Sequence, residues 1–281
     1  MYLFGAESPK IITPHFYVSL LLGFYAICKK YVSTINALFF TLLLEIVPEL
    51  YAHAALLLGN LPTTANVAMA ALTLFVALDK KDKNYLWLSA VLTSVALWTR
   101  NDIIGFAVAA LLIVTIHYAK QKEWKTIALY AIVAFSSIII WTLYLKFKID
   151  IPQTSRFTGG FGSGLGERLD AMLLYLIAML TWLQHGKMPP GHMLYGLAFM
   201  LPMVIILLNA KNIKSDKPFV LLYTFVAFAI YFTVFLVINE KAQGAPISEL
   251  MESSFKRGMF CFIPLLLFYA YTCKFSQAIF G

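Results

Sequence analysis

The stretch from Leu43 to Phe106 decides the fold. It consists of LLEIVPELYAHAALLLGNLPTTANVAMAALTLFVAL (43–78), the charged turn DKKDKN (79–84) and YLWLSAVLTSVALWTRNDIIGF (85–106). Apolar runs of about 17–25 residues cross a bilayer as helices, and a lysine turn between two of them marks the cytoplasmic side. The stretch therefore predicts two transmembrane hairpins, with most of the unusual polar groups near their outward-facing ends.

The composition extends this reading to the whole chain. Hydrophobic residues make up 60% of the 281 residues and charged residues only 13%, and the mean hydropathy is +0.78. These values exclude a soluble domain of this length. The apolar runs do not alternate with polar residues, as barrel strands would. We therefore expect an all-α, polytopic transmembrane helical bundle that forms one domain over residues 1–281.

The formal charge of +8 has the same explanation. The lysines lie in short turns between apolar runs, which is the positive-inside pattern, so nucleic acid is not expected as a partner. Helix parity and lysine turns together predict about nine spans. The first ends near residue 28, and the others cover 36–58, 62–78, 87–99, 103–118, 127–147, 193–208, 219–238 and 259–273.

One further helix is expected to lie on the outer face rather than cross. Residues 148–170 are glycine-rich and predict an external loop, and the apolar part of the helix at 168–185 is shorter than a span. An interfacial or re-entrant helix there puts Lys211, Lys214 and Lys217 inside. A second external loop is then expected at 239–257.

Glu45, Glu49 and His53 recur every four residues, so a continuous helix would carry them in one stripe. Pro48 lies inside this stripe and should kink the helix or open its hydrogen-bond ladder. Glu45 is either a buried acid that desolvation keeps neutral or part of a polar pathway. Glu49 and His53 are either structural groups or groups for acceptor binding and general-base chemistry.

Arg100 and Asp102 end an apolar helix on the outer side. Arg100 is an interfacial anchor, a local ion-pair partner of Asp102, or a phosphate-binding group, since arginine makes strong charge-assisted contacts with phosphate. Arg257 follows an external loop and has the same alternatives. The cysteines and histidines are dispersed, so no zinc site, disulfide frame or other metal site is predicted.

The order of these elements resembles the multispanning GT-C glycosyltransferases, a group that includes the protein O-mannosyltransferases and the lipid A aminoarabinose transferases. Three segments carry the resemblance: IVPELYAHAALLLGNLPTTANV (46–67), WTRND (98–102) and SFKRGMFCFIPLLLFYAY (254–271). This chain departs from the family pattern at two positions. Asn60 stands where the family often has an acid before the Leu-Pro pair, and Ile103 stands where a glycine often follows the acid of the basic–acid motif.

The resemblance implies a membrane glycosyltransferase in the plasma or inner membrane, with its active face extracytoplasmic. It implies transfer of a sugar from a polyprenyl-phosphate donor to an acceptor, with membrane lipids around the protein. A divalent metal is compatible with such sites. The family's catalytic carboxylate has no matching position in this chain, and Glu49 and Asp102 are the substitutes that we consider as catalytic residues. The candidate substrate-binding residues are Arg100, Arg257, His53, Glu45 and Asn60.

The family's catalytic carboxylate lies in the first external loop, after a first membrane helix. MYLFGAESPK (1–10) matches the end of that loop, so we expect an N-terminally truncated chain or a misplaced start. Two alternatives stay open. One is a proton-coupled transporter or lipid carrier that uses Glu45, and the other is a catalytically inactive remnant.

Overall fold

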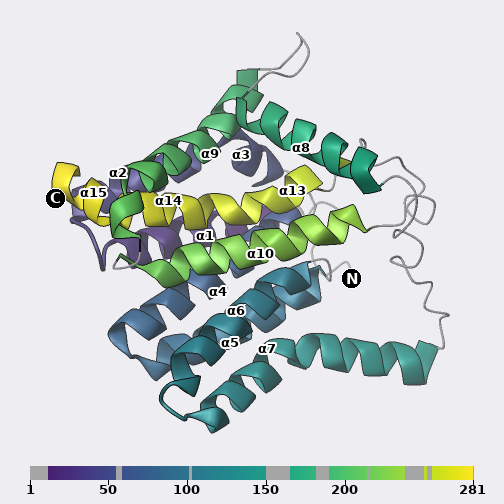
Figure 1. Ribbon diagram of the computed structural model, residues 1–281. Helices are drawn as coiled ribbons and strands as arrows, with labels where there is room; N and C mark the ends of the chain where they lie inside the picture. Colours follow the sequence, from purple (N-terminus) through teal and green to yellow (C-terminus); the bar gives the residue numbers. More distant parts are fainter. Residues whose placement is uncertain are drawn as a thin grey trace.

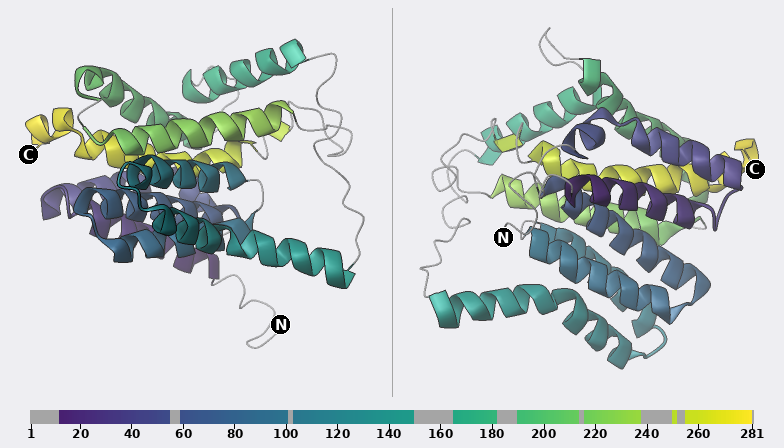
Figure 2. Two further views of the ribbon diagram at one scale, coloured as in Figure 1. Left: turned by 60° about the horizontal axis from the view of Figure 1, so that its bottom comes forward. Right: turned by 180° about the vertical axis from the view of Figure 1, so that it is seen from behind.

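The computed structural model describes residues 12–54, 59–100, 103–149, 165–181, 190–213, 216–237, 250–251 and 255–280. Within these ranges the chain is helical and contains no strand, which confirms the all-α prediction. The long helices lie roughly side by side and form a bundle, with the C-terminus at one end (Figures 1 and 2).

The helices follow one another in an up-and-down order, with two short irregular breaks. The main elements are α1 (Ile12–Cys28), α2 (Thr34–Glu45), α3 (Pro48–Ala54), α4 (Asn60–Lys80), α5 (Lys83–Thr99), α6 (Ile104–Ala119), α7 (Trp124–Tyr144) with the π-helical η3 (Leu145–Ile149), α8 (Leu165–Thr181), α9 (Pro190–Leu208) with the short η4 (Ala210–Asn212), α10 (Pro218–Leu236), α13 (Lys256–Met259), η6 (Phe260–Phe262), α14 (Ile263–Thr272) and α15 (Lys274–Phe280).

Helix α4 lies at the centre of the bundle. In its 18-residue apolar window, 89% of the residues are buried inside the protein, and it packs against α1, α5 and η6. Alanine and threonine make up much of its sequence, and small side chains allow neighbouring helix backbones to approach closely. Threonines inside it, such as Thr73, return their hydroxyl to a carbonyl in the preceding turn, so they add no unsatisfied polar group.

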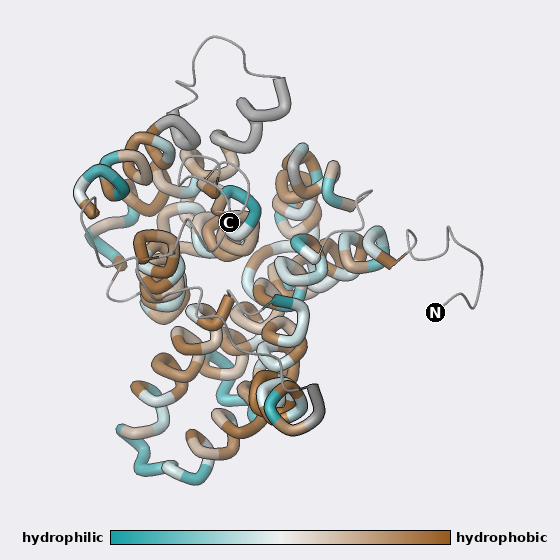
Figure 3. Tube along the Cα trace, turned by 90° about the vertical axis from the view of Figure 1, so that its right-hand side faces the viewer, coloured by the Kyte–Doolittle hydropathy of each residue, from teal (hydrophilic) through white to brown (hydrophobic). Residues whose placement is uncertain are grey.

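The outer helices present apolar side chains to their surroundings. Helix α7 has a window of mean hydropathy 2.1 of which only 17% is buried, and Ile35, Leu38, Phe39 and Leu42 form an exposed apolar stripe on α2. Such surfaces are stable when lipid covers them. Three described helices, Asn60–Lys80, Trp124–Phe147 and Pro218–Leu236, are long and apolar enough to cross a membrane by themselves. Apolar residues dominate the helices of Figure 3.

Each of the nine predicted spans has a helical counterpart, although the number that cross a membrane stays a prediction. The break at Pro48 is confirmed: α2 ends at Glu45, Val47 is not helical, and Pro48 opens α3. Tyr17 Oη donates to the Glu45 carbonyl oxygen at 2.8 Å, which satisfies one of the groups that the break leaves open. The last predicted span is also interrupted, by η6.

The loop boundaries differ from those expected. The predicted external loop 148–170 is helical at both of its described ends, since η3 continues to Ile149 and α8 begins at Leu165. The helix expected at 168–185 is described as α8, and its residues after Thr181 lie outside the described part. Of the loop expected at 239–257, Lys256 and Arg257 already belong to α13. The helices thus extend further into the polar loop sequences than the composition of these loops predicts.

The lysine-bearing turns meet at one end of the bundle, called here the lysine end. The Lys30 ammonium lies 5.1 Å from the Tyr85 ring centre, the Lys80 ammonium 5.2 Å from that of Tyr31, and Lys83 pairs with Glu123 at 3.3 Å. These contacts join the turns after α1, α4 and α6. Helix parity puts these lysine turns on one side of the membrane. The positive-inside rule predicts that this side is cytoplasmic.

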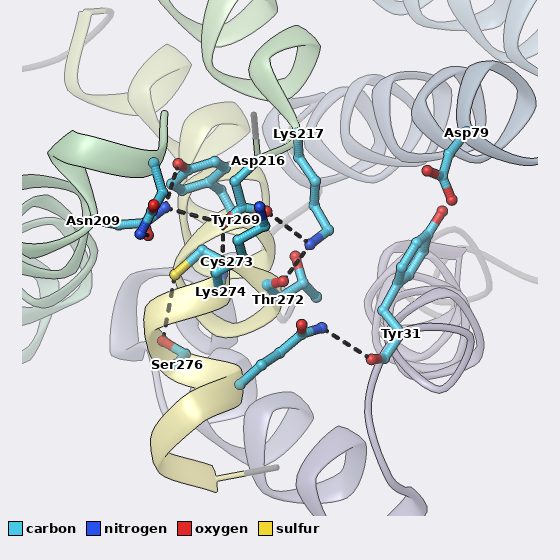
Figure 4. A network of polar contacts seen from close by, with 12 residues as sticks. Tyr31, Asp79, Asn209, Asp216, Lys217, Tyr269, Thr272, Cys273, Lys274 and Ser276 are labelled. Carbon is cyan, nitrogen blue, oxygen red and sulfur yellow. Dashed lines mark hydrogen bonds and ion pairs between the residues drawn. The ribbon is translucent and has the colours of Figure 1, made fainter. Parts of the chain in front are cut away.

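A buried polar network closes the same end (Figure 4). The Asp216 carboxylate, 3% exposed, accepts from Asn209 Nδ2 at 3.0 Å and from the backbone N–H of Lys274, and it pairs with Lys217 at 3.3 Å. Lys217 Nζ in turn donates to the Thr272 carbonyl. Asp216 therefore ties the α9–α10 connection to the junction between α14 and α15.

Replacement of Asp216 tests this network. Asp216→Ala removes one acceptor from the Asn209 amide, the Lys274 N–H and the Lys217 ammonium, and breaking a buried pair costs about 3 kcal/mol. We expect a clearly lower unfolding midpoint for the purified protein in detergent. Asp79→Ala, which removes an acid that pairs with Lys80 at the surface, should lower it much less. Equal midpoints for the two variants would contradict this role of Asp216.

Candidate functional site

The opposite end of the bundle carries the candidate site, where the first turn of α4 meets the last turn of α5. Arg100 caps α5 in an extended conformation, and its Nη1 donates to Asn60 Oδ1 at 2.6 Å. Asn60 is 6% exposed and is the first residue of α4. The contact fixes the guanidinium at the mouth of the bundle. Because the Asn60 amide is neutral, it orients Arg100 without adding negative charge.

Small and hydroxyl side chains bring these helix ends together. The Thr63 and Thr99 hydroxyls lie 2.9 Å apart, and Thr63 Oγ1 also donates to the Gly59 carbonyl at 2.6 Å. A Cβ on Gly59 would lie about 4 Å from the Arg100 side chain, at ordinary contact distance. The Asn60 Nδ2 atom is buried and has no hydrogen-bond partner among the described residues.

A cavity of about 240 Å³ opens beside Arg100. Besides Arg100 it is lined by Leu97, Trp98, Thr99, Ser137, Ile138 and Trp141. The two indole rings meet edge to face with centres 6.0 Å apart, and Trp98 is 60% exposed. The cavity thus combines a cation, hydroxyls and aromatic surface. Trp98 and Trp141 lie far apart in the sequence, and only the packing of α5 on α7 brings both to Arg100.

Arg257 lies at the same level of the bundle as Asn60. The hydroxyl of Thr64 in α4 lies 3.6 Å from the Sγ of Cys261 in η6. Asn60 is four residues before Thr64, and Arg257 is four residues before Cys261. From this contact, α4 and the segment from η6 through α14 both run toward the lysine end, where Lys80 and Thr272 lie near the turn at Tyr31. One helical turn in the opposite direction, Asn60 and Arg257 therefore both reach the other end of the bundle. Arg257 is half-buried there.

His53 lies one layer further in. Its ring is 8% exposed and lies 4.8 Å, centre to centre, from Phe260, the neighbour of Cys261. Helix α3 runs outward, so Glu49 is one turn deeper than His53 along the same helix. His53 therefore lies beneath the level of Arg100 and Arg257, packed against η6.

Glu45 does not share this surface. The expectation of one stripe through Glu45, Glu49 and His53 is wrong, because the helix is interrupted between Glu45 and Pro48. Glu45 is exposed at the end of α2, beside Tyr17, whereas His53 is buried. The expectation of Glu45 as a buried acid is also wrong. Asp102 lies outside the described residues.

Metal ligation has no support among the side chains of the described ranges, where no three His, Cys, Asp or Glu residues form a group that could hold an ion. The hydroxyl pair Thr63–Thr99 and the contact Thr64–Cys261 were missed in the sequence. The TTAN run after Pro62 and the threonine before Arg100 were the available signals, but helix pairing decides whether such hydroxyls meet.

The family model described as dolichyl-phosphate-mannose-protein mannosyltransferase matches residues 1–142, just over half of the chain. The chain belongs to this family. No curated protein and no solved structure matches it. Membership establishes an integral membrane glycosyltransferase of the GT-C type, a class that uses lipid-linked sugar donors. The match to the mannosyltransferase family includes Asn60 and Arg100, whereas Arg257 joins the candidate site through the helix register alone.

Gly258 holds Arg257 in this register. A Cβ on Gly258 would overlap with the Tyr231 hydroxyl and ring, and Tyr231 is packed against Phe255 with ring centres 5.2 Å apart. Tyr231 Oη also donates to the Phe255 carbonyl at 3.2 Å. Helix α13 therefore sits as close to α10 as a glycine permits.

We expect Gly258→Ala to destabilise the protein by about 1–3 kcal/mol and to lower glycosyl transfer, because overpacking pushes α13 and Arg257 away from α10. The checks are the unfolding midpoint in detergent and transfer from a lipid-linked sugar. Gly166→Ala in α8 is the matched control, since nothing lies within 4 Å of its Cβ. If both variants behave like the parent chain, the tight approach at Gly258 does not position Arg257.

Proposed function

We propose that this protein transfers a sugar from a polyprenyl-phosphate donor to an acceptor on the extracytoplasmic side of the membrane. The observation that carries the proposal is the Arg100–Asn60 hydrogen bond beside the 240 Å³ cavity. It lies at the end of the bundle away from the lysine turns, so the positive-inside rule puts it outside.

Arg100 and Arg257 are proposed to hold the donor phosphate. A sugar linked through a polyprenyl phosphate is a phosphodiester, and its phosphate gains negative charge as the bond to the sugar breaks. Guanidinium groups placed in advance bind this developing charge more strongly than the ground state, which lowers the barrier. Asn60 orients Arg100 for that purpose.

The reaction that this arrangement serves is a displacement at the anomeric carbon. The acceptor hydroxyl forms the new carbon–oxygen bond, the bond to the phosphate oxygen breaks, and the lipid phosphate leaves. A carboxylate takes the hydroxyl proton. We propose Glu49 or Asp102 for this role, and His53 in the wall of the acceptor side. The exposed rings of Trp98 and Trp141 offer apolar faces to the sugar or to the first part of the lipid.

Substitution of Arg100 tests the proposal. Arg100→Ala should lower kcat/KM by roughly 100-fold or more, in line with the loss of one preorganised donor to a developing charge. Arg100→Lys should lose about tenfold, because lysine keeps the charge but not the planar fork that Asn60 holds. Asn60→Ala should lie between the parent and Arg100→Ala. The measurement is transfer from a defined polyprenyl-phosphate sugar by the reconstituted protein.

Arg168→Ala provides a matched control, since this arginine lies on α8 and donates to the Leu236 carbonyl away from the cavity. It should retain activity within about threefold once its unfolding midpoint is shown to be unchanged. Activity of Arg100→Ala within the same range would rule out the proposed phosphate site. The transporter alternative receives no support from the position of Glu45, which does not line the cavity at Arg100.

A further inference from the structure

A second polar cavity lies at the lysine end, between the turn after α1 and the C-terminal helix α15. Its volume is about 430 Å³, larger than the cavity at Arg100. It is lined by Lys29, Lys30, Tyr31, Val32, Ser33, Asn36, Phe40, Tyr271, Ser276 and Gln277. The proposed transferase chemistry uses none of these residues.

The cavity is positively charged. Lys29 and Lys30 line it, and none of the described residues that line it is an acid. Two acids of the same end are engaged elsewhere: Asp216 is buried with Lys217, and Asp79 pairs with Lys80 and faces the Tyr31 hydroxyl (Figure 4). The two lysine ammonium groups lie over tyrosine rings, at 6.0 Å from Tyr25 and 5.1 Å from Tyr85, and these contacts leave the positive charge uncompensated.

The turn that carries the two lysines is held in place by surrounding elements. Gln277 Nε2 donates to the Tyr31 carbonyl at 3.3 Å, and the Tyr31 ring lies against Phe75 and Phe268 with centres about 5.5 Å apart. Burial, and then the Asp79 carboxylate, raise the pKa of Tyr31 well above its usual range, so its hydroxyl stays neutral. The cavity wall is therefore formed before any ligand arrives.

Neutral donors complete the wall. Ser33 caps α2 by accepting from the Asn36 N–H at 3.3 Å, and the other N–H groups of that first turn have no partner inside the helix. Tyr271 is 4% exposed, and its hydroxyl has no hydrogen-bond partner among the described residues. Its ring is stacked on Phe40 with ring centres 3.9 Å apart, and the hydroxyl lies beneath the cavity surface. Two ammonium groups and a helix N-terminus suit an anionic oxygen ligand.

We propose that this cavity binds a phosphate group, with the phosphorylated headgroup of an anionic membrane lipid as its natural source. Two observations favour the lipid over free phosphate. The cavity lies at the end of α1 and α2, both of which expose apolar side chains, so bilayer headgroups are within reach. The positive-inside rule also predicts this end to face the leaflet that is rich in anionic lipid.

Binding of short-chain lipids to the purified full chain tests the site. Dioctanoyl phosphatidylglycerol should bind more tightly than dioctanoyl phosphatidylcholine. The double variant Lys29→Gln/Lys30→Gln should lose about tenfold or more in affinity for phosphatidylglycerol, corresponding to one lost charge-assisted contact of about 1.4 kcal/mol.

Lys120→Gln/Lys125→Gln is the matched control, since it removes two exposed charges from the same end but outside the cavity. It should bind phosphatidylglycerol like the parent. If millimolar inorganic phosphate competes with phosphatidylglycerol for the cavity, a soluble phosphate is the source of the ligand. If it does not compete, the lipid is the source. Equal loss in both double variants would reduce the effect to general surface charge and overturn the site, as would equal affinity for the two lipids.

Discussion

The close packing of α4 is the constraint on which the rest of the structure depends. A helix buried among neighbours on nearly all sides must satisfy its own backbone and present side chains small enough for close approach. The alanines and threonines of α4 meet both conditions, because each threonine returns its hydroxyl to the helix or to a neighbour such as Thr99 or Cys261. Its two ends then determine where α5, η6 and the turn at Tyr31 come to lie.

The charged groups named above lie at two ends of the bundle, and a buried polar pair between them, Ser89 with Tyr130, is neutral. At one end Asn60 orients Arg100, and the parallel course of α4 and the final helices brings Arg257 to the same level. At the other end Asp216 and Tyr31 gather lysine turns and close the bundle. A transferase of this class acts on a lipid-linked donor, and a bundle with the proposed site at one end would bring the polar reaction to the membrane surface.

Sequence reasoning was most successful where local chemistry decides the outcome. The all-α class, the helical segments and the break at Pro48 follow from apolar length, lysine turns and the missing N–H of proline, and the structure contains them. It was least successful for the face that a residue presents. A four-residue spacing defines a stripe only while the helix is continuous, and the break at Ile46 and Val47 separates Glu45 on the surface from His53 in the core.

The sequence by itself determined that this is a helical membrane protein, where its helices lie and which polar residues stand near their ends, because each depends on neighbours within a few positions of the chain. Only the tertiary structure decided which of those residues meet. The contact of Arg100 with Asn60, the tryptophan pair beside it and the lysine cavity each join residues from separate helices. Those pairings depend on how helix surfaces fit together, and side-chain volume and hydrogen bonding across the interfaces set that fit.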